Sequence, residues 1–170
     1  IAKWAKKQGF KTYYYISPQV WAWKESRVNT LKKYIDELYV ILPFEKEFFE
    51  KKHNYKVHYF GNPVMNNIDE FIRTNKSKIQ SKKPIISILP GSRKQEVKKI
   101  LSDILKVINK FPNYRFIIAG VSHIDKEFYE KILNGNNTEI IFNKTYKLLN
   151  SSSFSIVASG TATLETALFN

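Results

Sequence analysis

Short runs of β-branched and aromatic residues alternate with longer amphipathic segments in the first part of the chain. Such runs are typical of strands, whereas apolar residues three and four positions apart, such as Val28, Leu31 and Ile35, indicate helices. Pro43 suits the first turn of a helix, and the helix dipole favours Glu45 in the same turn, where we interpret it as a surface residue. The pattern predicts strands at 11–16, 37–42 and 56–60 and helices at 20–35 and 43–53.

The same alternation returns from residue 84 onward. Residues 84–89 are almost continuously apolar, which is expected of a strand covered on both faces. The clearest helix, at 96–110, carries one apolar stripe that includes Val97, Leu101 and Ile104. Further strands are predicted at 114–120, 138–142 and 154–159, and further helices at 124–133, 145–152 and 161–169.

Residues 66–83 separate the two series. They are polar and rich in lysine, and one short helix is expected among them, around Ile68. Alternating strands and helices indicate parallel sheets covered on both faces, so we predict an α/β protein with two Rossmann-like domains. We place these domains at 1–65 and 84–170, with 66–83 as the linker. Because the chain starts without Met and stops inside a predicted helix, we expect an internal fragment in which both domains are incomplete.

The composition excludes some chemistry and leaves other interpretations open. There is no cysteine for a disulfide or a thiolate metal site, and three scattered histidines form no metal-ligand pattern. The 170 residues carry 28 basic and 15 acidic side chains, a net charge of +13. The basic excess is larger in residues 1–83, which also hold all three tryptophans. This distribution is compatible with anionic lipid headgroups, with nucleic acid, or with a proteome that is simply rich in lysine.

The segment LPGSR at 89–93 joins a predicted buried strand to an amphipathic helix, which is where doubly wound sheets bind phosphates. Gly91 lets the backbone approach a ligand closely, and the amides that open the next helix point at an anion. Ser92 offers a hydroxyl donor, and Arg93 offers a two-pronged guanidinium group for a diphosphate. The alternative is an ordinary turn with an exposed arginine.

The segment SGTATLE at 159–165 repeats this arrangement after another strand. Gly160 turns the chain, and Ser159 or Thr161 caps the following helix. Glu165, one turn later, has the oxygens to accept two hydrogen bonds from a ribose diol. The alternative is a helix cap with a glutamate that the dipole stabilises. Because both segments lie at carboxyl ends of strands in one predicted sheet, together they favour a nucleotide site.

Two further segments carry candidate side chains in the first part of the chain. Ser17 and Pro18 follow the first strand and lead to two tryptophans. Trp21 and Trp23 either stack on a sugar or an acyl chain, or pack in the core. Asn62, in the GNP that follows a strand, either belongs to a simple turn or lies at a cleft between the domains. No Ser-His-Asp set, cysteine nucleophile or pair of carboxylates is visible in the sequence.

Taken in order, five stretches resemble the lipid-A-disaccharide synthases, a family of glycosyltransferases with two Rossmann-like domains (the GT-B architecture). They are YYISPQVWAW at 14–23, LPFEKEFFEKK at 42–52, FGNPV at 60–64, LPGSRKQEV at 89–97 and SGTATLE at 159–165. The LPGSR and VWAW stretches are specific signals together, whereas SGTATLE is shared in outline with other UDP-sugar transferases.

The resemblance implies a reaction and a setting. The family transfers 2,3-diacylglucosamine from UDP-2,3-diacylglucosamine to 2,3-diacylglucosamine 1-phosphate, with inversion, and forms the β-1,6-linked lipid A disaccharide and UDP. Neither a metal nor another cofactor is implied. The setting is the cytoplasm of Gram-negative bacteria, peripherally on the inner-membrane surface. No nucleic acid is expected, and a homodimer is left open.

The resemblance also assigns roles to residues. The UDP side comprises Gly91, Ser92, Arg93, Tyr146 beside the uracil, Ser159, Gly160, Thr161 and Glu165. Arg93 is expected to stabilise the charge that develops on the departing UDP. The acceptor or lipid side comprises Ser17, Pro18, Trp21, Trp23 and Asn62. The general base is expected upstream of Ile1, so no base is named within the sequence.

Two rival functions remain open at the level of sequence. The first is another UDP-GlcNAc-type enzyme of the same architecture, either the peptidoglycan lipid-intermediate transferase or a UDP-GlcNAc epimerase. FGNPV and a Ser-Gly turn before a helical glutamate suit that transferase, but the VWAW stretch suits it less well. The second rival is a non-catalytic basic module that binds membrane or RNA, and it rests on the charge alone.

Overall fold

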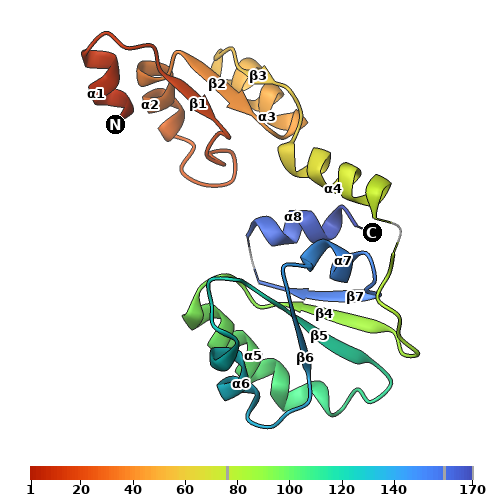
Figure 1. Ribbon diagram of the computed structural model, residues 1–170. Helices are drawn as coiled ribbons and strands as arrows, with labels where there is room; N and C mark the ends of the chain where they lie inside the picture. The colour runs from red at the N-terminus through yellow and green to blue at the C-terminus, as the bar shows by residue number, and fades with distance from the viewer. Residues whose placement is uncertain (76, 159, 170) are drawn as a thin grey trace. The chain divides into compact units, whose positions relative to one another are not determined.

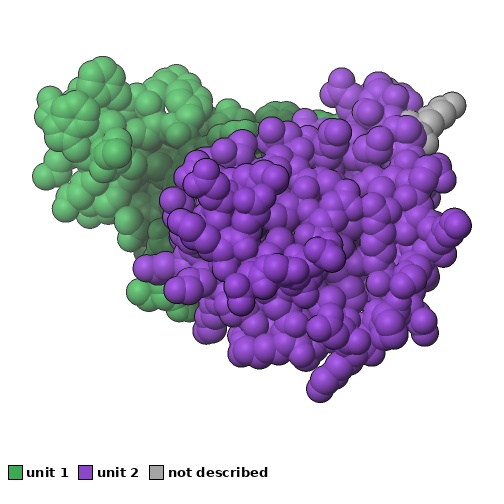
Figure 2. Space-filling view, turned by 60° about the horizontal axis from the view of Figure 1, so that its bottom comes forward, with its two compact units in different colours: residues 1–66 green, residues 67–170 purple. Residues whose placement is uncertain are grey.

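The computed structural model describes residues 1–75, 77–158 and 160–169. The chain forms two compact units, residues 1–66 and residues 67–170, which are coloured separately in Figure 2. Each unit contains one parallel β-sheet (Figure 1). Parallel sheets with helices between their strands confirm the α/β, Rossmann-like fold class that the alternating pattern predicts.

Unit 1 is built on a small sheet in which all strands are parallel and follow the order β1-β2-β3. Its elements are α1 (Ala2–Lys7), β1 (Tyr13–Tyr15), α2 (Arg27–Tyr34), β2 (Glu37–Val40), α3 (Pro43–Glu47), a π-helical turn (Phe48–Lys52) and β3 (His58–Tyr59). The last helix, α4 (Pro63–Thr74), begins in unit 1 and continues into unit 2.

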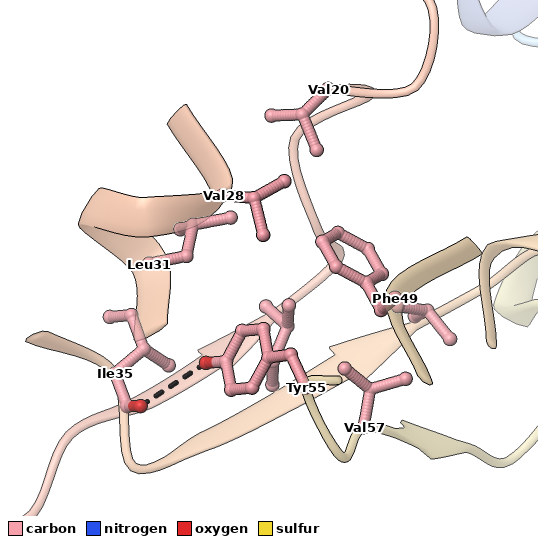
Figure 3. Close-up of a cluster of buried hydrophobic side chains, with 9 residues drawn as sticks. Val20, Val28, Leu31, Ile35, Phe49, Tyr55 and Val57 are labelled. Carbon is pink, nitrogen blue, oxygen red and sulfur yellow. Dashed lines mark hydrogen bonds between the residues drawn. The ribbon is translucent and has the colours of Figure 1, made fainter. Parts of the chain in front are cut away.

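The core of unit 1 lies where α2, β2 and the π-helical turn meet (Figure 3). Val28 and Leu31, spaced by three on α2, are buried there together with Phe49 of the π-helical turn. The Tyr55 hydroxyl donates a hydrogen bond of 3.1 Å to the Ile35 carbonyl, so the buried phenol keeps a polar partner. Other members of this cluster are Val20, Ile35, Leu38, Val40, Tyr55 and Val57.

Three elements of unit 1 differ from the pattern-based prediction. Helix α1 was not predicted, because none of its residues is buried and it therefore leaves no apolar stripe to read. Helix α2 begins at Arg27 rather than at residue 20, because Lys24 takes a left-handed conformation with φ of 55°, which interrupts a right-handed helix. Helix α4 begins at Pro63, directly after GN, whereas the pattern predicts a short helix around Ile68 within residues 66–83; proline suits the first helical position.

Glu45 corrects a further expectation, because it is not a surface residue. Its side chain is 1% exposed, and its Oε2 accepts hydrogen bonds from the amides of Ile41 at 3.2 Å and Leu42 at 2.9 Å. The carboxylate thus satisfies donors at the start of α3, as the glutamate of a capping box does. Its role is structural rather than that of a solvated helix residue.

Unit 2 is larger, and its described residues form a four-stranded parallel sheet in the order β6-β5-β4-β7. Its elements after α4 are β4 (Ile85–Leu89), α5 (Lys94–Ile108), β5 (Arg115–Gly120), α6 (Lys126–Leu133), β6 (Glu139–Phe142), α7 (Thr145–Leu149), β7 (Phe154–Val157) and α8 (Thr161–Ala167). The boundaries agree with the predicted strands and helices of this part to within a few residues.

Helices cover both faces of this sheet, as Figure 1 shows. On β5, Phe116 and Ile118 pack in one cluster with residues of α5 and α6, whereas Ile117 packs on the other face with α7. This alternation follows from the two-residue repeat of a strand. The two central strands, β4 and β5, are buried along almost their whole length, so their sequences are almost continuously apolar and predict strands clearly. The outer strand β7 is more exposed, at Phe154 and Ile156.

The strand order creates a switch point between β4 and β7. The chain runs outward from β4 through β5 to β6, then returns to the opposite side of β4 as β7. Helix α5 leaves β4 toward one face and α8 leaves β7 toward the other (Figure 1). The two connections therefore diverge at the carboxyl ends of neighbouring strands, which is where open α/β sheets hold their ligands.

Across the residues that the structure describes, there is no helix with both the length and the apolar character required to cross a bilayer.

Candidate functional site

A cavity of about 320 Å³ lies in unit 2 at the carboxyl ends of β4, β5 and β7. It occupies the switch point of the sheet, and its volume is in the range of small-molecule sites. Its lining combines the ends of three strands with the first turns of α5, α7 and α8. The lining residues are Leu89, Pro90, Gly91, Ser92, Glu96, Ala119, Val121, Thr145, Ala158, Gly160, Thr161, Ala162 and Glu165.

The turn after β4 has a conformation that requires glycine. Gly91 has φ of 99°, and a Cβ added there would lie 2.7 Å from Oε2 of Glu96. The carbonyl of Ser92 accepts a hydrogen bond of 2.7 Å from Nε2 of His123, which ties this turn to the segment after β5. Helix α5 begins at Lys94, so its first amides, which have no partner within the helix, open beside the turn.

Arg93 lies beside the cavity but is not one of the described residues that line it. Its guanidinium Nη1 is 2.8 Å from Oε1 of Glu96, and the Arg93 side chain is 82% exposed. The lining carboxylate of Glu96 therefore holds the guanidinium in this structure. An anion in the cavity would compete with Glu96 for the guanidinium, and such an exposed ion pair is weak enough to open.

The turn after β7 brings the second predicted segment to the same cavity. Gly160 has φ of 142° and precedes Thr161, the first residue of α8. Both line the cavity, and so does Glu165 one turn further along the helix. Ser159, which belongs to the same predicted set, lies outside the described residues. The two sequence segments, about seventy residues apart, are thus neighbours in the fold.

Glu165 has a partner that the sequence did not suggest. The Tyr146 hydroxyl donates a hydrogen bond of 2.9 Å to Oε1 of Glu165. Burial, together with the adjacent Glu165 carboxylate, raises the pKa of Tyr146 to about 12, so the phenol stays protonated at neutral pH. Tyr146 lines a neighbouring hollow with Phe71 and Asn75 and is not among the described residues that line the Glu165 cavity.

The candidate residues of the acceptor side belong to unit 1. Trp21 is 38% exposed and meets Phe44 edge to face, with ring centroids 4.9 Å apart. Trp23 is 65% exposed, and the Lys24 ammonium group lies 4.4 Å from the centroid of its ring. The two indoles are therefore at the surface, not in the core. Ser17 is buried, and its hydroxyl donates to the carbonyl of Pro18 at 3.0 Å.

Asn62 has a local structural role. It is 4% exposed, and its Oδ1 accepts a hydrogen bond of 3.0 Å from the amide of Val64 in the first turn of α4. This is the geometry of an N-cap, which satisfies one amide that the helix itself leaves unpaired.

Among the described residues, sequence reasoning missed three polar side chains in or beside the cavity, those of Glu96, His123 and Thr145. Glu96 lies three positions after Arg93, a spacing that places the two side chains near each other and was available as a signal. His123 and Thr145 follow β5 and β6, and their positions depend on how those strands are ordered in the sheet. Among the residues that the structure describes, no group of three His, Cys, Asp or Glu side chains is arranged to hold a metal ion.

The fold and the cavity together define a Rossmann-like α/β protein with its candidate site at the topological switch point. Sequence comparison identifies the family. The model of the lipid-A-disaccharide synthetase family matches residues 1–170, and the chain belongs to this family. The resemblance carried by the five sequence stretches is thereby confirmed.

Two relatives give the extent of the similarity. The lipid-A-disaccharide synthase of Francisella philomiragia is 33% identical over an alignment of 180 positions, which covers 99% of this chain and 47% of the relative. The lipid-A-disaccharide synthase of Francisella tularensis subsp. tularensis is 31% identical over an alignment of 182 positions, which also covers 99% of this chain and 47% of the relative. The chain therefore spans about half the length of the curated relatives it matches.

Proposed function

We propose that the chain is part of a glycosyltransferase that forms the lipid A disaccharide, and that its unit 2 binds the UDP portion of the donor. The donor is UDP-2,3-diacylglucosamine and the acceptor is 2,3-diacylglucosamine 1-phosphate. Family membership supports the reaction, because the relatives are named lipid-A-disaccharide synthases. The residues that line the cavity support the positions that we propose for the diphosphate and the ribose of UDP.

One observation carries the UDP assignment. Gly91 and Ser92 from one segment share a single cavity with Gly160, Thr161 and Glu165 from another. The glycine turn and the open amides of α5 suit the diphosphate, because helix N-termini and close backbone approach favour anions. The Glu165 carboxylate suits the ribose, because it accepts hydrogen bonds from two neighbouring hydroxyls. The spacing of these groups around one cavity supports a ligand with a phosphate end and a diol end.

The chemistry that follows is inverting transfer. The acceptor 6-hydroxyl attacks the anomeric carbon from the side opposite UDP, its proton leaves to a general base, and the C–O bond to the diphosphate breaks. Negative charge then develops on the departing UDP. Arg93, once released from Glu96, and the amides at the start of α5 are the groups in this sequence that stabilise that charge. We assign no residue of this sequence as the base.

We place the acyl chains and the membrane on the side of unit 1. Trp21, Trp23 and Phe44 are large apolar side chains exposed at its surface, and indoles suit the boundary between water and lipid. The acylated substrates are amphipathic, so we expect the enzyme to work peripherally at the cytoplasmic face of the inner membrane. A homodimer is compatible with this proposal and is not required by it.

The proposal is tested by measuring sugar transfer from the donor to the acceptor by the full-length protein. Gly91→Ala is the test variant and Gly135→Ala is its matched control. Both glycines have positive φ, 99° and 82°. A Cβ added at Gly91 would lie 2.7 Å from the Glu96 carboxylate, whereas a Cβ added at Gly135 would have no atom of the described residues within 4 Å. We expect Gly91→Ala to weaken UDP binding and to slow UDP release in the transfer reaction, each by at least about ten-fold. The added methyl group displaces the Glu96 carboxylate and blocks the close approach of a diphosphate to this turn. Gly135→Ala should retain both, apart from the shared effect of backbone strain on stability.

The same assay decides the substrate class. We expect efficient turnover with diacylated UDP-glucosamine and little with the non-acylated donor. Equal turnover of the two donors would remove the lipid A assignment and favour another UDP-sugar enzyme. Equal activity of the Gly91→Ala and Gly135→Ala variants would remove the β4–α5 turn from the site.

A further inference from the structure

The hydrogen bond from Tyr146 to Glu165 joins two helices that are separate in the sequence. Tyr146 is the second residue of α7, and Glu165 is the fifth residue of α8. The bond is 2.9 Å long and partly buried. A bond between a phenol and a carboxylate is charge-assisted, and partial removal from water strengthens it. Glu165 is therefore held in one position before any ligand enters the cavity.

The Tyr146 ring is itself fixed by aromatic neighbours. Its centroid is 5.6 Å from that of Phe71 on α4, at an interplanar angle of 78°, and 5.4 Å from that of Phe169. Phe71 and Phe169 also contact each other, with centroids 5.9 Å apart. Three mutually packed rings leave the phenol little rotational freedom, so its hydroxyl has a fixed direction toward Glu165.

The carboxylate of Glu165 keeps spare capacity after this bond. A carboxylate has two oxygens and about four lone-pair sites, and Tyr146 occupies one of these sites on Oε1. The remaining sites are sufficient for both hydroxyls of a vicinal diol. A glutamate side chain that is already oriented loses less conformational entropy when a ligand binds. Its orientation therefore increases the affinity for a vicinal diol, whose two hydroxyls need both carboxylate oxygens in place.

We propose that Tyr146 is a positioning residue that sets specificity: its hydroxyl holds Glu165 so that the carboxylate recognises the ribose diol of the nucleotide. This rests on the proposed function, in which Glu165 binds the ribose. It also reassigns Tyr146, which the family resemblance suggested as a uracil neighbour. Tyr146 acts through Glu165 and needs no contact with the ligand. Helix α4 contributes through Phe71, because that ring keeps the phenol in place.

Tyr146→Phe tests this inference, because it removes the hydroxyl and keeps the ring that packs on Phe71 and Phe169. The measurement is the diol preference, defined as the Kd of a UDP analogue lacking both ribose hydroxyls divided by the Kd of UDP. It is made by titration calorimetry on the full-length chain. Glu165→Gln is the reference variant. Tyr114→Phe is the matched control, since Tyr114 also packs edge to face on a phenylalanine, with centroids 6.0 Å apart.

We expect Tyr146→Phe to reduce the diol preference about five-fold, the size of one net hydrogen bond, with the Kd of the analogue unchanged. Glu165→Gln should reduce it further, and the double variant should behave like Glu165→Gln, since the two residues act as one unit. Tyr114→Phe should keep the wild-type preference. An unchanged preference in Tyr146→Phe, or equal weakening of UDP and the analogue, would overturn the positioning role.

Failure of the underlying assignment gives a different result. If wild type has no diol preference, or if Glu165→Gln retains it, Glu165 does not bind the ribose, and the role of Tyr146 falls with it. If Glu165→Gln loses the preference and Tyr146→Phe does not, Glu165 remains the ribose residue and only the inference about Tyr146 is wrong.

Discussion

Arg93 and Glu96 form an ion pair at the edge of the candidate site. The Glu96 carboxylate lines the cavity and holds the Arg93 guanidinium at 2.8 Å, whereas a diphosphate in the same place would compete for that guanidinium. A carboxylate in a cavity also repels an anion. In the free protein Arg93 balances the charge of Glu96, and ligand binding exchanges one anionic partner of Arg93 for another.

Substitution of Arg93 measures this exchange. We expect Arg93→Ala to weaken UDP binding by about 1.5–3 kcal/mol, the range for a hydrogen bond to a charged group. Glu96→Gln should bind UDP at least as tightly as wild type, because it frees the guanidinium and removes a negative charge. Lys106→Ala, an exposed cation further along the same helix, is the control. Calorimetric titration with UDP provides the values, and unchanged affinity in Arg93→Ala would mean that this arginine is only a surface residue.

Among the elements, α4 combines several roles. It starts directly after the GN of the FGNPV stretch, passes from unit 1 into unit 2, and supplies Phe71 to the aromatic cluster around Tyr146. Asn62 caps its first turn through the bond to the amide of Val64. The cap explains a buried asparagine at this position without any contact to substrate.

Removal of the cap separates the two interpretations of Asn62. We expect Asn62→Ala to lower the free energy of unfolding by about 1 kcal/mol, the usual contribution of an N-cap side chain. Asn67→Ala, at an exposed position inside the same helix, should leave the stability unchanged or slightly higher, because alanine favours helix. Urea unfolding followed by circular dichroism measures both. A variant Asn62→Ala of normal stability but reduced transfer would instead favour the acceptor-side role that the sequence suggested.

On the scale of the whole molecule, the sequence predicts the strand–helix alternation well because buried parallel strands and amphipathic helices leave strong periodic patterns. It predicts elements without buried faces poorly, and α1 is the example. At the site, the glycine turns were readable because the sheet edge where they lie follows from chain order. The hydrogen bond between Tyr146 and Glu165 could not be predicted from the sequence, because it depends on how two short helices pack and not on any spacing in the sequence.

The location of UDP in a crystal structure of the full-length chain tests the central claim most directly. We predict that the diphosphate lies against the turn at Gly91 and the first amides of α5, and that the ribose hydroxyls contact Glu165. The contradicting result is UDP bound elsewhere while this cavity stays free of nucleotide. The basic hollow beside Lys83 and Arg115 is one such alternative position.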